Sequence, residues 1–269
     1  MFACMKYGFL GAGKMATAII EGLLKSEVPA ARIVVAGPEK LHLEKLSHRF
    51  GVATSASNEM AARSADLVLL CVKPNETSAA LESCGSSLDG KILLSIVSGK
   101  TLHSLSVLAP GARIARCMPN TAATIGESAT AYCCSESLTS GDRAAVESVL
   151  RCMGAFWEVP EHSLDAVTGL SGSGPAYVFL FLEALTEGGV KAGLPAALAR
   201  ELAIQTLRGA AALAASEGLH PAILREMVTS PGGTTAAGLL ELENAAVRGA
   251  LIRAVEAAAL RATELSSAR

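Results

Sequence analysis

Two runs rich in glycine and hydroxyl side chains are the parts of the sequence best suited to bind a small anion. The run T-G-L-S-G-S-G-P-A-Y spans residues 168–177, and the run S-P-G-G-T-T spans residues 230–235. Each run is expected to open a helix. Backbone amides at a helix N-terminus, together with nearby hydroxyls, can hold an anion without a cationic side chain. The C-terminal part of the chain is therefore predicted to contain an anion site.

A third glycine-rich run lies near the N-terminus. A predicted strand over residues 6–10 leads directly into G-A-G-K-M-A. Gly11 allows the tight turn, Gly13 lets a pyrophosphate approach the backbone, and Ala16 lets the following helix pack closely on the strand. A second strand at residues 33–36 completes the expected βαβ unit, so the run predicts a dinucleotide-binding site.

The residues after the second strand bear on the choice of dinucleotide. Folds specific for NAD place an acidic side chain there, whereas this chain has Ala36, Gly37 and Pro38. Glu39 follows late, and Lys40 beside it could neutralise a 2′-phosphate. The pattern favours NADPH, with NADH as the alternative, although both charges could equally lie in solvent at a helix start.

Two further motifs follow predicted strands. C-V-K-P covers residues 71–74, and R-C-M-P-N-T covers residues 116–121. Open α/β sheets bind ligands at the carboxyl ends of their strands. Lys73 could neutralise a phosphate or simply reach solvent with its ammonium group, and Asn120 could orient the nicotinamide amide or a water.

Composition excludes several classes of protein. The chain has 269 residues, a net charge of −2, 51% hydrophobic and 4% aromatic residues, so no electrostatic footprint for nucleic acid is present. Seven cysteines without a C-x-x-C pair indicate neither a zinc site nor a disulfide framework. The apolar runs are shorter than a membrane span. We expect a soluble cytoplasmic protein without a metal, a nucleic-acid partner or a membrane partner.

The hydrophobic pattern predicts an α/β class with two domains. The first, residues 1–161, alternates buried strands with helices, as in a doubly wound, mostly parallel sheet. The second, residues 162–269, reads as helices only, and several of these are apolar around most of their circumference. Such helices require cover from a second subunit. Strands are expected at 6–10, 33–36, 67–72, 92–95, 114–117, 130–133 and 155–159, and helices at 14–25, 40–50, 75–81, 140–153, 173–192, 196–217, 221–229, 235–241 and 244–267.

Taken together, the five motifs closely resemble pyrroline-5-carboxylate reductase over residues 8–265. The glycine motif near the N-terminus is widespread, whereas G-L-S-G-S-G-P-A-Y and S-P-G-G-T-T as a pair are highly specific. The resemblance implies a Rossmann domain, a helical dimerisation domain, often a ring of dimers, and NAD(P)H-dependent reduction of 1-pyrroline-5-carboxylate to L-proline.

The resemblance also implies roles for individual residues. Amides of Gly233, Thr234 and Thr235 and the hydroxyls of Ser230 and Thr235 are expected to grip the substrate carboxylate. Thr235 corresponds to a residue beside the ring nitrogen and is the main catalytic candidate, with Ser230 second. Glu161, Ser171 and Ser173 are further substrate-binding candidates, although the run around Ser171 could instead serve only to cap and pack a helix. The expected cofactor contacts are Leu10, Gly11, Ala12, Gly13, Lys14, Met15, Ala36, Pro38, Asn58, Cys71, Val72, Lys73, Pro74 and Asn120.

Two other functions fit parts of the pattern. A Rossmann dehydrogenase or imine reductase could act on another small carboxylic acid, with Lys73 near the chemistry. A non-enzymatic module could sense NADPH by binding it without turnover. Neither explains the anion-binding run at residues 230–235.

Overall fold

The computed structural model describes residues 5–267 of the chain. Its internal contacts divide the chain into two compact units. Unit 1 takes in the residues up to Ser173 together with those from Ala257 onward, and unit 2 is Gly174–Glu256. The chain therefore leaves unit 1 once and returns to it at the end. The expected domain boundary between residues 161 and 162 stays a prediction.

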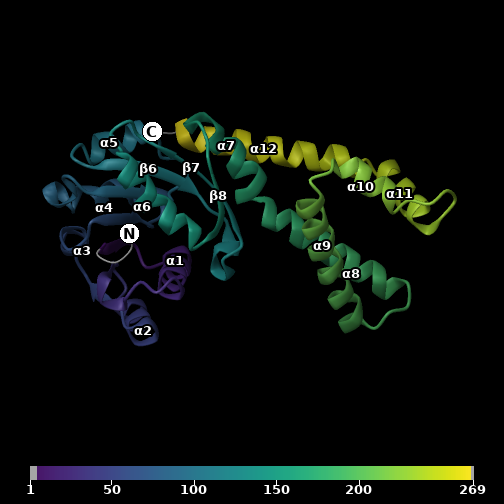
Figure 1. Cartoon of the computed structure of the whole chain (residues 1–269), viewed down its shortest axis with the longest axis horizontal. Coiled ribbons are helices and arrows are strands. Elements are labelled where there is room, and N and C mark those ends of the chain that lie inside the picture. Colours follow the sequence, from purple (N-terminus) through teal and green to yellow (C-terminus); the bar gives the residue numbers. More distant parts are fainter. Residues whose placement is uncertain (1–4, 268–269) are drawn as a thin grey trace. The chain divides into compact units, whose positions relative to one another are not determined.

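Unit 1 is built on one eight-stranded sheet (Figure 1) with the strand order β3-β2-β1-β4-β5-β6-β7-β8. Neighbouring strands are parallel except β6 and β7. The class predicted from the sequence, an α/β fold with a mostly parallel sheet, is confirmed. The strands are β1 (Tyr7–Leu10), β2 (Ile33–Ala36), β3 (Ala53–Ser55), β4 (Leu67–Leu70), β5 (Ile92–Ser95), β6 (Arg113–Met118), β7 (Ser128–Cys134) and β8 (Gly154–Glu158).

Helices cover both faces of this sheet because its strands bury both. Tyr7 and Phe9 of β1 pack with one set of helices, and Leu10 packs with the other. The first face is covered by α1 (Lys14–Lys25), α2 (Lys40–Phe50) and α6 (Ser140–Arg151). The second is covered by α3 (Asn58–Arg63), α4 (Thr77–Glu82) and α5 (Leu102–Leu108).

The short elements of unit 1 are those that the hydrophobic pattern did not predict. β3 has three residues and no buried side chain, so it offers no apolar run to detect. Helices α3, α5 and α7 (Leu164–Val167) have only one or two turns, and short 3-10 turns connect several elements of unit 1. These turns are η1 (Ala30–Arg32), η2 (Pro74–Glu76), η3 (Gly85–Leu88), η4 (Thr121–Ile125) and η5 (Glu161–Ser163), and a π-helical turn, η6 (Thr168–Gly172), follows α7.

Unit 2 is helical. It contains α8 (Gly174–Lys191), α9 (Ala196–Glu217), α10 (Pro221–Met227), α11 (Thr234–Asn244) and the first part of α12 (Val247–Ser267). Helices α8 and α9 pack against each other, and a Cβ atom added to Gly189 would lie 3.0 Å from the Cβ atom of Ala199. Many large apolar side chains of these helices are exposed in the single chain, including Phe179 at 60% and Leu180 at 65%.

Within residues 5–267, no helix is both long enough and apolar enough to span a bilayer. Nor does this part of the chain group three or more metal-binding side chains. Its six cysteines are free thiols, and Cys4 lies outside the described residues.

Candidate functional site

Gly11 forms the turn between β1 and α1 and could not be another residue without strain. Its φ angle is +103°, a region that side chains disfavour. A Cβ atom here would lie 2.6 Å from the carbonyl oxygen of Cys71, the residue that follows β4. The Gly11 amide also donates to the Ala36 carbonyl over 2.9 Å. The turn is thus tied to the ends of both neighbouring strands.

Gly13 leaves open space in front of the N-terminus of α1. Apart from Gly13 itself and its adjacent backbone, no described atom lies within 4 Å of an added Cβ atom, and the helix has no side-chain cap. The first helical hydrogen bond runs from the Thr17 amide to the Gly13 carbonyl over 3.0 Å, so the amides before Thr17 have no acceptor within the helix. Ala16 is fully buried. The cradle therefore fits a dinucleotide pyrophosphate.

The site lies where the sheet topology changes direction. β1 pairs with β2 on one side and with β4 on the other, and ligands of open α/β sheets bind at such a switch point. The Cys71 amide donates to the Leu10 carbonyl over 2.8 Å, which places C-V-K-P beside the glycine turn. Burial raises the pKa of the Cys71 thiol, and a role of Cys71 in cofactor binding stays a prediction. Lys73 and Pro74 are exposed.

The end of β2 presents no carboxylate to a ribose. Gly37 is buried, and its Cβ position lies 3.3 Å from the Cβ atom of Ala12. The Lys40 side chain is 91% exposed and pairs with Glu44 over 3.9 Å. Asn58, another predicted cofactor contact, lies at the start of α3, where its Nδ2 donates to the Ser83 hydroxyl over 3.1 Å.

Asn120 follows β6 and is almost fully buried, at 9% exposure. Its Oδ1 accepts a hydrogen bond from the Ala122 amide over 3.0 Å and so caps η4. Its Nδ2 donates to the Ser171 carbonyl over 3.1 Å. Both polar side-chain atoms of Asn120 are thus engaged with the protein, and contact with the nicotinamide stays a prediction.

The run at residues 168–177 opens α8 at Gly174, as expected, and its first part around Ser171 forms the π-helical turn η6. Its Ser171 hydroxyl donates to the Val167 carbonyl over 3.2 Å, and Ser173 is half-buried. A Cβ atom on Gly172 would lie 2.8 Å from Cε of Met118, the last residue of β6. Such turns within helices occur frequently at functional sites.

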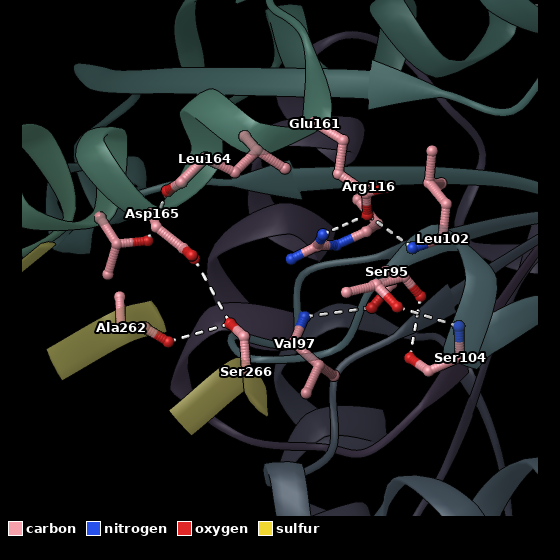
Figure 2. Close-up of polar contacts among 12 residues, drawn as sticks. Ser95, Val97, Leu102, Ser104, Arg116, Glu161, Leu164, Asp165, Ala262 and Ser266 are labelled. Atoms are coloured by element: carbon pink, nitrogen blue, oxygen red, sulfur yellow. Dashed lines mark hydrogen bonds and ion pairs between the residues drawn. The ribbon is translucent and has the colours of Figure 1, made fainter. Parts of the chain in front are cut away.

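Glu161 is held by two donors (Figure 2). Its Oε1 accepts from Nη1 of Arg116 over 2.5 Å and from the Leu102 amide, at the start of α5, over 2.6 Å. The Arg116 side chain is only 8% exposed and the Glu161 side chain 33% exposed. The contact joins β6, α5 and η5. Substrate binding by Glu161 stays a prediction.

In unit 2, Ser230 and Gly233 shape the N-terminus of α11. Gly232 has a φ angle of +69°, and the Gly233 amide donates to the Ser230 carbonyl over 3.1 Å. A Cβ atom on Gly233 would collide with the Ser230 hydroxyl. Helix α11 has no side-chain cap, and its first helical bond is from Ala237 to Gly233 over 3.2 Å. The open amides precede Ala237, and Thr235, among them, is half-buried.

Two family models match parts of the chain. Residues 161–265 match the family described as pyrroline-5-carboxylate reductase dimerisation, and residues 6–99 match the coenzyme F420-dependent NADP oxidoreductase family. The chain is 44% identical over 263 residues to pyrroline-5-carboxylate reductase of Arabidopsis thaliana, with coverage of 97% of this chain and 95% of the relative. The chain belongs to the pyrroline-5-carboxylate reductase family.

Solved structures of pyrroline-5-carboxylate reductases have the same fold. The enzyme from Plasmodium falciparum, solved with NADP bound, is 31% identical with a TM-score of 0.90, and 98% of each chain is covered. The enzyme from Coxiella burnetii is 34% identical with a TM-score of 0.91, and coverage is 98% of this chain and 99% of that one. The family resemblance read from the motifs is confirmed.

As a member of the pyrroline-5-carboxylate reductase family, the chain carries two groups of predicted site residues. Unit 1 gathers the glycine turn, the ends of β2 and β4, Asn120 and Ser171, whereas residues 230–235 lie in unit 2. Sequence reasoning missed two anchors of unit 1. Arg116 holds Glu161, and Asp165 accepts a hydrogen bond from the Ser266 hydroxyl over 3.4 Å (Figure 2). Asp165 also accepts a hydrogen bond from the Thr263 hydroxyl over 3.0 Å. The charge of Arg116 within a buried strand was the available signal for the first.

Proposed function

We propose that the protein reduces 1-pyrroline-5-carboxylate to L-proline with NADPH. One observation carries the proposal. In this family member, glycine-rich runs open two helices that have no side-chain cap, α1 after the dinucleotide motif at Gly13 and α11 after S-P-G-G-T-T at Gly233. The first suits a pyrophosphate and the second suits a carboxylate. A reductase of a small cyclic imino acid needs both.

The cofactor site consists of the turn and strand ends around β1. The amides of residues 13–16 hold the pyrophosphate, and the absence of a carboxylate at Ala36–Pro38 accommodates a 2′-phosphate, which favours NADPH over NADH. The bound nicotinamide supplies the hydride. Lys40 is free to swing toward a phosphate because its pairing with Glu44 is long and exposed. Besides these, the proposed contacts are Leu10, Gly11, Ala12, Lys14, Met15, Asn58, Cys71, Val72, Lys73 and Pro74.

The substrate carboxylate is gripped at the start of α11. The amides of Thr234 and Thr235 and the hydroxyl of Ser230 donate to it, because Gly233 leaves room for the Ser230 hydroxyl. The Thr235 hydroxyl lies beside the ring nitrogen and orients it. Protonation makes the imine carbon electrophilic, so a substrate that enters as the iminium accepts hydride at carbon and keeps its proton on nitrogen. Ser171, Ser173 and Glu161 of unit 1 are secondary proposals for substrate binding.

The unit 2 helices join two copies of the chain. Their exposed apolar side chains, such as Phe179 and Leu180, would be covered in a homodimer. A ring of such dimers is a further part of the proposal. A cytoplasmic location also belongs to it, because the described cysteines are free thiols, the state maintained in reducing compartments.

The test is an enzyme assay in which purified protein is mixed with 1-pyrroline-5-carboxylate and either NADPH or NADH. Oxidation of the cofactor is measured as a decrease in the absorbance of the reduced nicotinamide. We expect turnover with both and a higher kcat/KM with NADPH. Proline formation, measured separately by amino-acid analysis, should match the cofactor consumed. Binding of NADPH without turnover would favour a sensing module, and turnover only of an open-chain acid would favour another dehydrogenase.

A further inference from the structure

The motifs M-P-N-T and G-L-S-G-S-G form one structural unit, although about fifty residues separate them in the sequence. The Asn120 side chain donates to the Ser171 carbonyl over 3.1 Å. Independently, the Cβ position of Gly172 lies 2.8 Å from Cε of Met118. The π-helical turn η6 is therefore seated directly on the end of β6, with a hydrogen bond on one side and a close glycine contact on the other.

Asn120 is itself fixed on its other sides. Its backbone amide donates to the hydroxyl of Ser128, which is 1% exposed, over 2.9 Å. Its Oδ1 caps η4, and Ala123 of η4 packs in the same core cluster as Ala16 and Ile19 of α1. A chain of short contacts thus runs from the pyrophosphate helix α1 through η4 and Asn120 to η6.

We propose that Asn120 is a positioning residue that holds the Ser171–Ser173 segment in register with the cofactor helix. This inference rests on the proposed function. Asn120 is 9% exposed, its Oδ1 accepts from the Ala122 amide, and one of the two N–H groups of its Nδ2 donates to the Ser171 carbonyl, so these contacts hold the protein backbone. Its effect on the reaction passes through Ser171, whose carbonyl it fixes, and hence through the substrate side of the site.

The variant Asn120→Asp isolates the contact with Ser171. A carboxylate oxygen still caps the Ala122 amide, because aspartate is as good a cap as asparagine. The second oxygen, however, faces the Ser171 carbonyl, and two acceptors repel each other. Only the protonated carboxyl has an O–H that can donate to this carbonyl. The matched control is Asn120→Ala, which loses both contacts and has no titratable group.

We expect Asn120→Asp to lower kcat/KM for pyrroline-5-carboxylate about tenfold at pH 8. At this pH the hydrogen bond to the Ser171 carbonyl is lost and is replaced by repulsion between two acceptors. The ratio of variant to wild-type activity should then rise as the pH falls toward the pKa of the new carboxyl, which burial raises. Asn120→Ala should show a ratio independent of pH. The affinity for NADPH, measured by fluorescence titration, should change less than about twofold in Asn120→Asp, since the group acts through Ser171.

Several outcomes would overturn the inference. A variant-to-wild-type ratio that does not change with pH in Asn120→Asp would show that the donor to Ser171 plays no part. A selective loss of NADPH affinity would instead assign Asn120 to the cofactor. Thermal unfolding checks that each variant is folded, and Asn120→Ser retains a capping hydroxyl if both other variants unfold. Failure of the proposed function is separate, because the wild-type protein would then show no turnover.

Discussion

The carbonyl oxygen of Cys71 lies 2.6 Å from the position that a Cβ atom of Gly11 would occupy. The two residues follow β1 and β4, the strands between which the sheet reverses its order. Position 11 therefore requires glycine for two reasons: a side chain would collide with the backbone of Cys71, and the φ angle is positive. This contact keeps the strand ends close together at the glycine turn.

Gly11 and Gly13 should differ when replaced by alanine. Gly11→Ala combines a strained φ angle with a backbone collision, and we expect it to lower the free energy of unfolding by about 2–4 kcal/mol. Gly13→Ala has free space around its new methyl group in the protein. It should fold with a loss of less than about 1 kcal/mol, yet bind NADPH about tenfold more weakly because the methyl group meets the pyrophosphate. Urea unfolding measures the stability of the two variants, and titration with NADPH measures their affinity for the cofactor. An unchanged affinity in Gly13→Ala would place the cofactor elsewhere.

Thr235 and its neighbour Thr234 provide a matched pair in the proposed carboxylate cradle. Thr235→Val keeps the shape and the backbone amide but removes the hydroxyl. We expect kcat/KM for pyrroline-5-carboxylate to fall roughly 10- to 100-fold, as when a polar substrate group loses its partner. Thr234→Val should stay within about threefold of wild type, since only its amide is assigned a role. Steady-state kinetics decide the matter, and equal effects of the two variants would argue against a specific role for the Thr235 hydroxyl.

Substitution of Phe179 in α8 can test the proposed dimer. Its ring is 60% exposed in the single chain, so a charge at this position costs little unless a partner covers it. Phe179→Asp should convert the dimer to monomers in light scattering and abolish most activity, because buried unpaired charge is strongly unfavourable. Leu41→Asp on α2, at a residue 66% exposed in unit 1, is the control and should remain dimeric. A dimeric Phe179→Asp variant would exclude this face of α8 from the interface.

The hydrogen-bonded carboxylate of Asp142 should make the free energy of unfolding depend on pH. Burial raises its pKa, but hydrogen bonds from Thr139 and Arg113 outweigh burial and hold the pKa below its usual value. A carboxyl with a lowered folded-state pKa stabilises the protein above its unfolded-state pKa and loses this contribution as the pH falls through the folded-state value. Asp142→Asn should therefore cost about 1 kcal/mol at pH 7, the value of a helix cap.

The cost of Asp142→Asn should shrink below about pH 4, where the wild-type carboxyl also begins to take up a proton. Urea unfolding at a series of pH values measures it. The control is Glu136→Gln, which removes an exposed carboxylate and should change little at any pH. A cost that persists undiminished in acid would show that packing, and not charge, accounts for the effect.

Much of the fold could be predicted because its elements follow local rules. The strands Ile33–Ala36 and Ile92–Ser95 and the helices Lys14–Lys25, Lys40–Phe50 and Ala196–Glu217 have the bounds that periodicity and turn residues indicate. Short pieces could not be predicted. Two of them, β3 and η6, exist because of neighbours: β3 pairs with β2, and η6 packs on Met118.

By itself, the sequence determined the α/β class, the five motifs and hence the family, because hydrophobic period and glycine placement depend only on neighbouring residues. Only the tertiary structure decided which motifs meet. It joined Gly11 to Cys71 and Asn120 to Ser171, and it gave Glu161 a buried arginine partner. These contacts span between 45 and 60 residues of chain, measured from the paired positions. Such pairings arise from the order of strands in a sheet, which no local pattern encodes.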